Sequence, residues 1–362
     1  MVYKVIGLIS GSSLDGLDIA YVHLEEVRGN WSYTVHHATC IPYTEPWAHN
    51  LSTTAQQPVA DFLRLHTAYG HFLGGQVRDF MERHDLVHKV DFIASHGHTV
   101  FHDPAAQTTF QLGDGAAIAA ETGLPVISDL RALDVALGGQ GAPIVPVGDK
   151  LLFGGYDYLL NIGGIANLTV RRGETLLAFD VCPANQILNT LAQRAGQPYD
   201  AEGQLAAAGV LLTGVLHELN SLPYYRQPAP KSLSNEAARD MIFPAFYESG
   251  HTVPDMLHTM AQHIADQVAA AVQQYPAATA TPQLLITGGG ALNTFLAARI
   301  KDTVAPLHLD VTIPDTETIQ FKEAIVMALI GTLRWREEVN VFSSVTGAAK
   351  DSCGGALWMQ QG

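Results

Sequence analysis

Residues 3–25 read YKVIGLISGSSLDGLDIAYVHLE, and this stretch decides the fold that the sequence predicts. A short apolar run over residues 3–9 ends at Gly11, and alternating apolar residues resume over residues 19–25. Strand-forming runs separated by glycine, serine and aspartate are typical of two antiparallel strands joined by a tight turn. The stretch therefore predicts a strand, a tight polar turn and a second strand.

The turn has the composition of a phosphate site, although an ordinary polar hairpin would have the same composition. Small residues let the backbone N–H groups approach an anion, and two serine hydroxyls add donors. Asp15 is a candidate ligand for Mg²⁺, acting through water. The chain has no G-x-x-x-x-G-K-[ST] sequence, and no G-x-G-x-x-G follows a strand, so the two standard phosphate loops are not expected. The candidate phosphate-binding residues are Gly11, Ser12, Ser13, Leu14, Asp15 and Gly16.

Two more glycine turns follow expected strands in the second half of the chain. A glycine pair separates the strands expected at residues 156–161 and 165–170, which repeats the strand-turn-strand pattern as a weak internal duplication. Three consecutive glycines follow the strand expected at residues 284–286. Each glycine costs up to about 1 kcal/mol in an ordered element, so a flat ligand such as a purine is a good candidate to lie against them. The candidate nucleotide-binding residues here are Gly163, Gly164, Gly288, Gly289 and Gly290.

The remaining sequence alternates strands with helices, which indicates an α/β protein. Its 362 residues suit about two domains. The flexible segment at residues 138–143 predicts a hinge, with one domain over residues 1–140 and a second over residues 141–362. Further strands are expected at residues 90–94, 124–127 and 178–180, and helices at residues 60–82, 187–195, 256–272 and 322–335.

The composition excludes several classes of protein. Hydrophobic residues make up 47% of the chain and charged ones 15%, which predicts a large buried core. The net charge of −15 argues against a nucleic-acid partner, which would need a surplus of lysine and arginine. Apolar runs are too short for a membrane span or a signal peptide, and the three widely spaced cysteines do not form a disulfide framework. We therefore expect a cytoplasmic protein.

Asp180 stands at the end of an expected strand, before a loop that contains proline. A carboxylate in this position is a candidate general base, and the alternative is a cap for the helix that starts near Gln186. Cys182 lacks a neighbour that would lower its pKa, so an inert thiol is expected. Lys231 could reach an anionic ligand or remain a solvated surface residue.

Polar residues also gather in the first half of the chain. Asp129 and Asp134 flank Arg131, where they could bind substrate hydroxyls or pair with one another. His96, His98 and His102 follow a spacing loosely like that of a binuclear metallohydrolase. No matching distal motif accompanies them, so hydrogen bonding by His98 and Thr99 to a polar ligand is favoured over a metal site.

Many ordered segments together resemble the anhydro-N-acetylmuramic acid kinase family across nearly the whole chain. The resemblance implies a two-domain actin/hexokinase-like (ribonuclease H-like) ATPase fold with a cleft between the domains. It also implies an ATP- and Mg²⁺-dependent kinase of cell-wall recycling that opens the 1,6-anhydro bond of the sugar with water and phosphorylates O6. The segments include GLISGSSLDGLD (7–18), SHGHTVFH (95–102), LNIGGIANLT (160–169), FDVCPAN (179–185), PAPKS (228–232), LITGGGALN (285–293) and KEA (322–324).

The resemblance also implies roles for individual residues. Asp180 would take a proton from the water that attacks the anomeric carbon. The segment from Gly11 to Asp18, which includes Leu17, would bind the phosphates, and closure about residues 138–143 would exclude bulk water. A homodimer is a reasonable expectation for a cytosolic enzyme. The candidates for the sugar side are His98, Thr99, Arg131 and Glu323.

The chain departs from the family at positions that affect the sugar more than the phosphate. The family often has glutamine where His98 stands, and DTGPGN where this chain has DVCPAN, so Cys182 and Ala184 replace glycines. If either glycine needs a positive φ, the loop that carries Asp180 must change its path. The alternatives are a kinase for another amino sugar, a nucleotide-driven binding module on the same fold, and a zinc hydrolase.

Overall fold

The computed structural model describes residues 1–11, 14–173, 175–247 and 250–359. It divides the chain into two compact units, the first made of Met1–Gly154 with Phe321–Gly362 and the second of Gly155–Gln320. This division differs from the boundary expected at residues 140 and 141. It differs because helix α13 (Thr316–Trp335) returns the chain to the core of the first unit.

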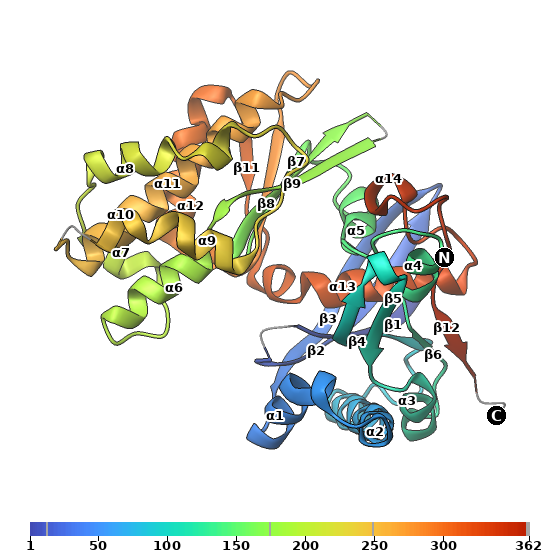
Figure 1. Cartoon of the computed structure of the whole chain (residues 1–362). Coiled ribbons are helices and arrows are strands. Elements are labelled where there is room, and N and C mark those ends of the chain that lie inside the picture. The colour runs from blue at the N-terminus through green and yellow to red at the C-terminus, as the bar shows by residue number, and fades with distance from the viewer. Residues whose placement is uncertain (12–13, 174, 248–249, 360–362) are drawn as a thin grey trace. The chain divides into compact units, whose positions relative to one another are not determined.

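The first unit is built on a mixed sheet whose strands lie in the order β12–β6–β4–β1–β2–β3, with β5 paired to β4 (Figure 1). Strands β1, β2 and β3 are antiparallel neighbours, whereas β4 runs parallel to β1 and β6 runs parallel to β4. The two strands expected around the first turn are confirmed. The bounds are β1 Val2–Ser10, β2 Gly16–Val27, β3 Asn30–Pro42, β4 Phe92–Asp103, β5 Thr108–Leu112, β6 Val126–Ser128 and β12 Ala356–Trp358.

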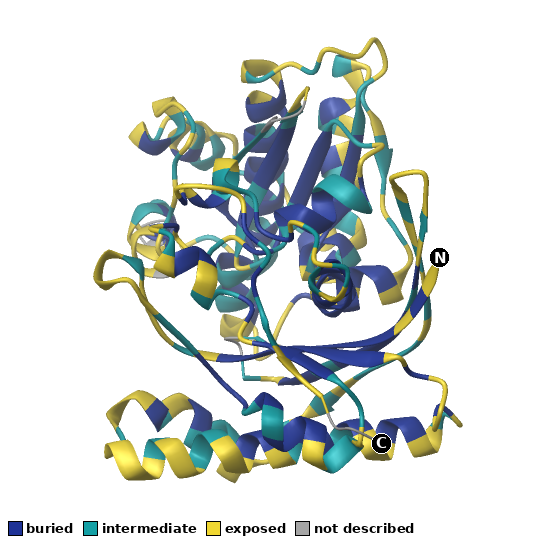
Figure 2. Cartoon of the chain, turned by 90° about the vertical axis from the view of Figure 1, so that its right-hand side faces the viewer, coloured by how far each residue is buried: buried dark blue, intermediate teal, exposed yellow. Residues whose placement is uncertain are grey.

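Helices cover both faces of this sheet. Successive side chains of β1 point to opposite faces, so they enter two different cores. Val5 and Ile9 belong to a core that includes α13, whereas Ile6 and Leu8 pack in a second core with α2. Figure 2 shows that the helices at the bottom of the view are buried toward the strands and exposed on the opposite side. The other helices of this unit are α1 Glu45–Thr53, α2 Val59–Arg83, α3 Gly115–Thr122, α4 Ala132–Ala136, α5 Pro146–Leu151 and α14 Ser343–Thr346.

Helix α13 lies unusually close to β1. A Cβ atom added to Gly7 would lie only 1.9 Å from the backbone oxygen of Ala324. From residue 321 to residue 333 every position is buried except Glu323. A helix that is buried almost all round belongs to a core, so the one exposed carboxylate is a candidate for function.

The second unit repeats the strand order of the first. Its sheet runs β11–β10–β7–β8–β9, so β7, β8 and β9 are antiparallel neighbours and β10 and β11 extend the sheet in parallel from β7. The strands are β7 Tyr158–Ile162, β8 Ile165–Arg172, β9 Thr175–Pro183, β10 Gln283–Thr287 and β11 Asp310–Thr312. The helices are α6 Asn185–Arg194, α7 Gln204–Ala208, α8 Thr213–Asn220, α9 Asn235–Ile242, α10 Pro244–Tyr247, α11 Val253–Gln274 and α12 Thr294–Val304.

In both sheets the third, second, first, fourth and fifth strands along the chain lie side by side, apart from β5 and β12 in the first unit. The two units thus share one topology, although the sequence suggests only a weak duplication. This repeated α/β unit is the actin/hexokinase-like fold, as the sequence predicts.

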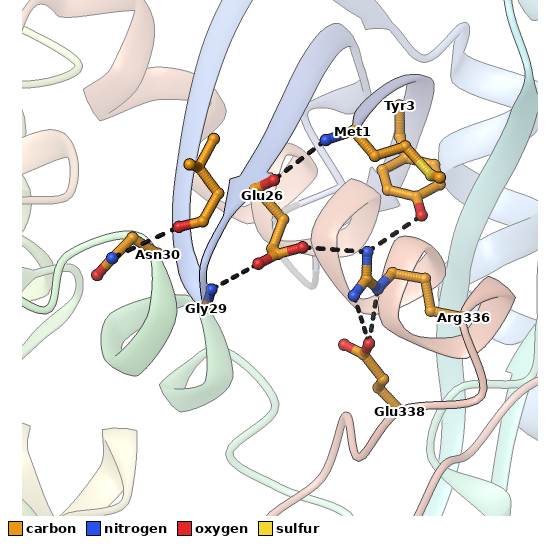
Figure 3. Close-up of polar contacts among 8 residues, drawn as sticks. Met1, Tyr3, Glu26, Gly29, Asn30, Arg336 and Glu338 are labelled. Atoms are coloured by element: carbon orange, nitrogen blue, oxygen red, sulfur yellow. Dashed lines mark hydrogen bonds and ion pairs between the residues drawn. The ribbon is translucent and has the colours of Figure 1, made fainter.

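Arg336, just after α13, ties the end of that helix to the first hairpin (Figure 3). Its guanidinium group lies 2.6 Å from a carboxylate oxygen of Glu338 and 3.5 Å from one of Glu26. It also donates a hydrogen bond of 3.2 Å to the Tyr3 hydroxyl and lies 5.4 Å from the ring centre of Trp31. Charge pairing and aromatic contact therefore reinforce the packing of α13 on β1 and β2.

Gly7→Ala should destabilise the protein strongly, because the new methyl group meets backbone atoms of α13 that cannot move independently. We expect the free energy of unfolding to fall by about 3 kcal/mol or more, measured by urea denaturation. Gly75→Ala is the matched control, because a Cβ added to Gly75 of α2 meets no atom within 4 Å. It should raise stability by up to about 1 kcal/mol, and a loss at Gly7 no greater than the change at Gly75 would contradict the packing argument.

Candidate active site

The first turn follows directly from the pairing of β1 with β2. Ser10 pairs with Leu17, and the expected serines 12 and 13 lie outside the described residues. In the described part, the Leu14 N–H donates to the Gly11 oxygen at 3.4 Å, and Leu14 has a left-handed φ of 57°. The exposed Asp15 accepts a hydrogen bond of 3.0 Å from the Gly16 N–H. The turn is therefore tight, and its phosphate-binding role remains a prediction.

Asp18 has the most perturbed carboxyl group near this turn. Desolvation and, to a smaller extent, the neighbouring charges of Asp15 and Glu323 raise its pKa to about 6, against the effect of a hydrogen bond from Cys40. The thiol faces Asp18 because the two residues pair across β2 and β3. Desolvation and Asp18 together raise the pKa of Cys40 to about 12, so the thiol stays protonated and donates.

Glu323 is the exposed position between residues 321 and 333 of α13, and its charge is linked to those of its neighbours. Desolvation raises the pKa of Glu323, whereas the positive charges of Arg131 and Lys322 lower it and Asp15 raises it. Lys322 itself is buried and lies 2.8 Å from a carboxylate oxygen of Asp149 in α5. That ion pair and the packing on β1 hold the helix backbone on both sides of Glu323.

Arg131 is held in place by uncharged partners. Its Nε donates to Nε2 of His96 at 2.8 Å, and one terminal nitrogen donates to the Gly141 oxygen at 2.5 Å. Nδ1 of His96 lies 3.0 Å from the Gly97 oxygen, so it donates there and leaves Nε2 free to accept. Burial lowers the pKa of His96 to about 3, and the ring is therefore neutral. Arg131 is thus fixed without losing its positive charge.

His98 and Thr99 lie where β4 passes the start of the first turn. His98 is buried, pairs with Ser10 across β1 and β4, and its Nδ1 lies 3.1 Å from the Ser10 hydroxyl. The Tyr43 hydroxyl donates to the same oxygen at 2.8 Å. Thr99, the next residue, is exposed. The first unit therefore brings the turn, Asp18 and His98 to one end of β1.

The two aspartates that flank Arg131 have separate environments. Asp134 is buried, and its carboxylate accepts hydrogen bonds of 2.7 Å from both the Gly141 N–H and the Thr346 hydroxyl. These contacts hold the loop at residues 138–143 inside the first unit, which differs from the expected hinge role of that loop. Asp129 is exposed and has a left-handed φ of 57°.

In the second unit, the turn between β7 and β8 holds the start of α6. The Gly163 oxygen accepts from the Asn185 N–H at 3.0 Å, and the Gly164 oxygen accepts from the N–H groups of Ala184 and Gln186 at 2.9 and 3.2 Å. A Cβ added to either glycine would meet no atom closer than 3.5 Å. The carbonyl groups thus support α6, and the packing around the turn does not itself require glycine at either position.

The three glycines after β10 have different surroundings. A Cβ on Gly288, whose φ is 81°, would lie 2.6 Å from the side-chain oxygen of Asn161, and one on Gly290 would lie 2.2 Å from Ile162. The protein itself therefore requires glycine at these two positions. Gly289 is exposed, and a Cβ added to it would meet no atom closer than 3.7 Å. The expectation of a purine surface thus narrows to Gly289, where it remains a prediction.

Asp180 lies in β9 and does not cap a helix. The residue that precedes α6 is Ala184, which makes no side-chain cap, so the capping alternative is wrong. One carboxylate oxygen of Asp180 accepts a hydrogen bond of 2.8 Å from the Leu233 N–H. Desolvation raises the pKa of Asp180, although that hydrogen bond lowers it. The residue therefore has the environment of a strengthened base.

Neither departure around Asp180 lies at a left-handed position. Cys182 and Ala184 both lack a positive φ, so neither has the backbone conformation that favours glycine. Cys182 is fully buried, and desolvation raises the pKa of its thiol, as expected for an inert cysteine. Lys231 is partly exposed, and its Nζ lies 4.4 Å from the ring centre of Tyr224.

Several residues that the sequence did not single out complete these environments. Ser10 contacts His98 and Tyr43 contacts Ser10, while Tyr224 and Leu233 contact Asp180. Their backbone and hydroxyl contacts link positions far apart in the chain, and no local pattern reveals them. Over the described residues, no group of three or more potential ligands could hold a metal ion. Within the same residues, no helix has both the length and the apolar character to cross a membrane.

The comparisons with known proteins agree with the sequence motifs. A model of the family described as anhydro-N-acetylmuramic acid kinase matches residues 3–360. A protein of that name from Gloeobacter violaceus is 33% identical, over 95% of this chain and 96% of the relative. Another from Francisella tularensis subsp. novicida is 34% identical over 95% of each chain. Among solved structures, component A of the Acidaminococcus fermentans (R)-2-hydroxyglutaryl-CoA dehydratase matches 90% of this chain and 96% of its own, with 11% identity and a TM-score of 0.47.

Asp18→Asn should stabilise the protein at high pH only. The pKa of Asp18 is raised in the folded chain from 3.8 to about 6, so its contribution to stability is fully present below pH 3.8 and is lost as pH rises through 6. Asparagine avoids this loss and can still accept from Cys40. We expect a gain of about 1–2 kcal/mol at pH 8 after solvent screening, and little change at pH 4, measured by urea denaturation. Equal gains at both pH values would contradict this electrostatic account.

Proposed function

The chain belongs to the anhydro-N-acetylmuramic acid kinase family, and we propose that it uses ATP to open and phosphorylate 1,6-anhydro-N-acetylmuramic acid. As a member of this family it is a kinase, a phosphotransferase with an alcohol group as acceptor. The products are N-acetylmuramic acid 6-phosphate and ADP, in the recycling of peptidoglycan. The family match over residues 3–360 carries this proposal.

Apart from the proton transfer, the reaction makes two bonds and breaks two. Water bonds to C1 of the sugar as its proton passes to Asp180, and the electron pair of the C1–O6 bond moves to O6. O6 then bonds to the γ-phosphorus of ATP as the bond between that phosphorus and ADP breaks. A base placed in this way typically contributes about 10²–10⁴-fold to the rate. Burial of Asp180, which raises its pKa, supports this role.

The residues of the first turn, Gly11 to Asp18, are proposed to bind the phosphates of ATP. Asp15 and Glu323 both raise the pKa of Asp18, so three carboxyl groups act on one another there. Carboxylate oxygens suit Mg²⁺, and the exposed Asp15 is proposed to hold the ion through water. Mg²⁺, when bound with ATP, neutralises phosphate charge in a loose transition state. Gly163 and Gly164 are proposed as the second phosphate turn, and Gly289 as the contact for adenosine.

The sugar is proposed to contact the first unit through His98, Thr99, Arg131 and Glu323. Arg131 is fixed by His96 and Gly141 before any ligand arrives, and such preorganisation reduces the free energy lost on binding. Glu323 accepts hydrogen bonds from hydroxyl groups when ionised. A cytoplasmic location and a homodimer remain predictions for this enzyme.

The decisive assay mixes the purified protein with ATP, Mg²⁺ and 1,6-anhydro-N-acetylmuramic acid in H₂¹⁸O. The 6-phosphate should form with one ¹⁸O atom at C1, because water opens the ring, and mass spectrometry measures both. A phosphorylated sugar without ¹⁸O would instead indicate transfer to an ordinary hydroxyl group. ATP hydrolysis that does not depend on any sugar would indicate a nucleotide-driven binding module.

Asp180→Asn should reduce product formation by at least about 10²-fold while leaving ATP affinity almost unchanged. The asparagine oxygen can still accept from the Leu233 N–H, so the fold is preserved and the loss reports on the missing base. Product formation and ATP binding are measured by mass spectrometry and calorimetry. Turnover close to that of the wild type would remove Asp180 from the proposed role.

A further inference from the structure

Asp180 is held at three of its atoms by one short segment of the second unit. Its N–H donates to the Lys231 oxygen at 3.0 Å, and its backbone oxygen accepts from the Tyr224 hydroxyl at 2.7 Å. Its carboxylate Oδ2 accepts from the Leu233 N–H at 2.8 Å. Both sides of the Asp180 backbone and one carboxylate oxygen are therefore fixed by residues 224–233.

The ring of Tyr224 is itself held on several sides. Tyr224 lies in the 3₁₀ turn Pro223–Arg226 and is only 8% exposed. Nζ of Lys231 lies over its ring and donates to its backbone oxygen at 3.2 Å. The ring of Tyr225 meets it edge-on, with 5.6 Å between ring centres. The hydroxyl group of Tyr224 therefore has little freedom to leave Asp180.

Tyr225 anchors the same segment in the core on the side away from Asp180. Its hydroxyl lies 2.8 Å from Nε2 of His263, whose Nδ1 lies 2.7 Å from the side-chain oxygen of Asn220. That oxygen can only accept, so Nδ1 of His263 donates and Nε2 accepts from Tyr225. Burial lowers the pKa of His263 to about 3, which agrees with a neutral ring. The two adjacent tyrosines therefore bind different residues, Tyr224 to Asp180 and Tyr225 to His263.

We propose that Tyr224 is a positioning residue for Asp180, and that Oδ1 is the oxygen that receives the proton from water. The Tyr224 hydroxyl fixes the β9 backbone so that Oδ2 meets the Leu233 N–H, and this contact turns Oδ1 toward the reacting water. The proposal rests on the proposed role of Asp180 as the base. It adds that Oδ1 is the oxygen that accepts the proton and that Tyr224 sets the orientation of the carboxylate.

Tyr224→Phe tests this directly, because it removes one hydroxyl group and keeps the ring. We expect kcat to fall about 5- to 20-fold, the effect of losing one hydrogen bond, with the KM values for ATP and sugar almost unchanged. The acid limb of the kcat profile should move to higher pH. It moves because a loosened Leu233 contact stabilises the ionised carboxylate less, so Asp180 keeps its proton to a higher pH.

Tyr225→Phe is the matched control in the next residue. It should lower the free energy of unfolding, because Nε2 of the buried His263 loses its partner, without moving the pH profile. If both variants lose kcat in proportion to stability, or if Tyr224→Phe leaves kcat and the pH profile unchanged, the proposal is overturned.

Leu233→Pro is an independent test, because proline removes the N–H that binds Oδ2. It should also move the acid limb of the kcat profile to higher pH, whereas Leu233→Ala should not. An unmoved limb in the proline variant would count against Oδ1 as the proton acceptor. A wild-type protein that is inactive on the anhydro-sugar would refute the proposed function instead, so the two failures are distinguishable.

Discussion

The contact between Gly7 of β1 and the backbone oxygen of Ala324 in α13 sets the spacing on which the first unit depends. Because a Cβ at residue 7 would lie 1.9 Å from that oxygen, the helix can approach the sheet only where β1 has glycine. A second glycine allows the same approach from α5, since a Cβ on Gly148 would lie 2.3 Å from Val326. Core packing, rather than a local signal, therefore leaves Glu323 exposed.

Two charged side chains of the candidate site are held by hydrogen bonds to uncharged groups. Arg131 is oriented by hydrogen bonds to a neutral histidine and a carbonyl group, while its charge also acts on the carboxylate of Glu323. One carboxylate oxygen of Asp180 likewise accepts from an uncharged group, the Leu233 N–H. Hydrogen bonds fix these side chains while their ionic character stays available, which a tight ion pair would prevent.

Much of the fold could be predicted because its signals are local. The strands on either side of Gly11, the long helix α2 and the strand that ends near Asp180 all follow from apolar patterns in adjacent residues. The return of α13 to the first unit could not be predicted from local patterns, because an apolar helix of this kind could pack in the core of either unit.

The roles of individual residues could likewise be predicted only where the signal is local in the sequence. Asp180 was recognisable from its position in the chain and from the family motifs. Tyr224 was not, because its contact with Asp180 joins residues 44 positions apart. The glycines after β10 suggested a ligand surface, yet Gly288 and Gly290 are explained by Asn161 and Ile162, which only the folded chain brings near.

The return of the chain after residue 320 also determines the order in which the protein can fold during synthesis. The second unit is one continuous stretch, so all of it has been made before α13 is complete. Until then the first sheet lacks the helix that covers Val5, Ala20 and Phe92, and this apolar face is open to the solvent and to chaperones. The earliest strands to leave the ribosome are thus among the last to be enclosed.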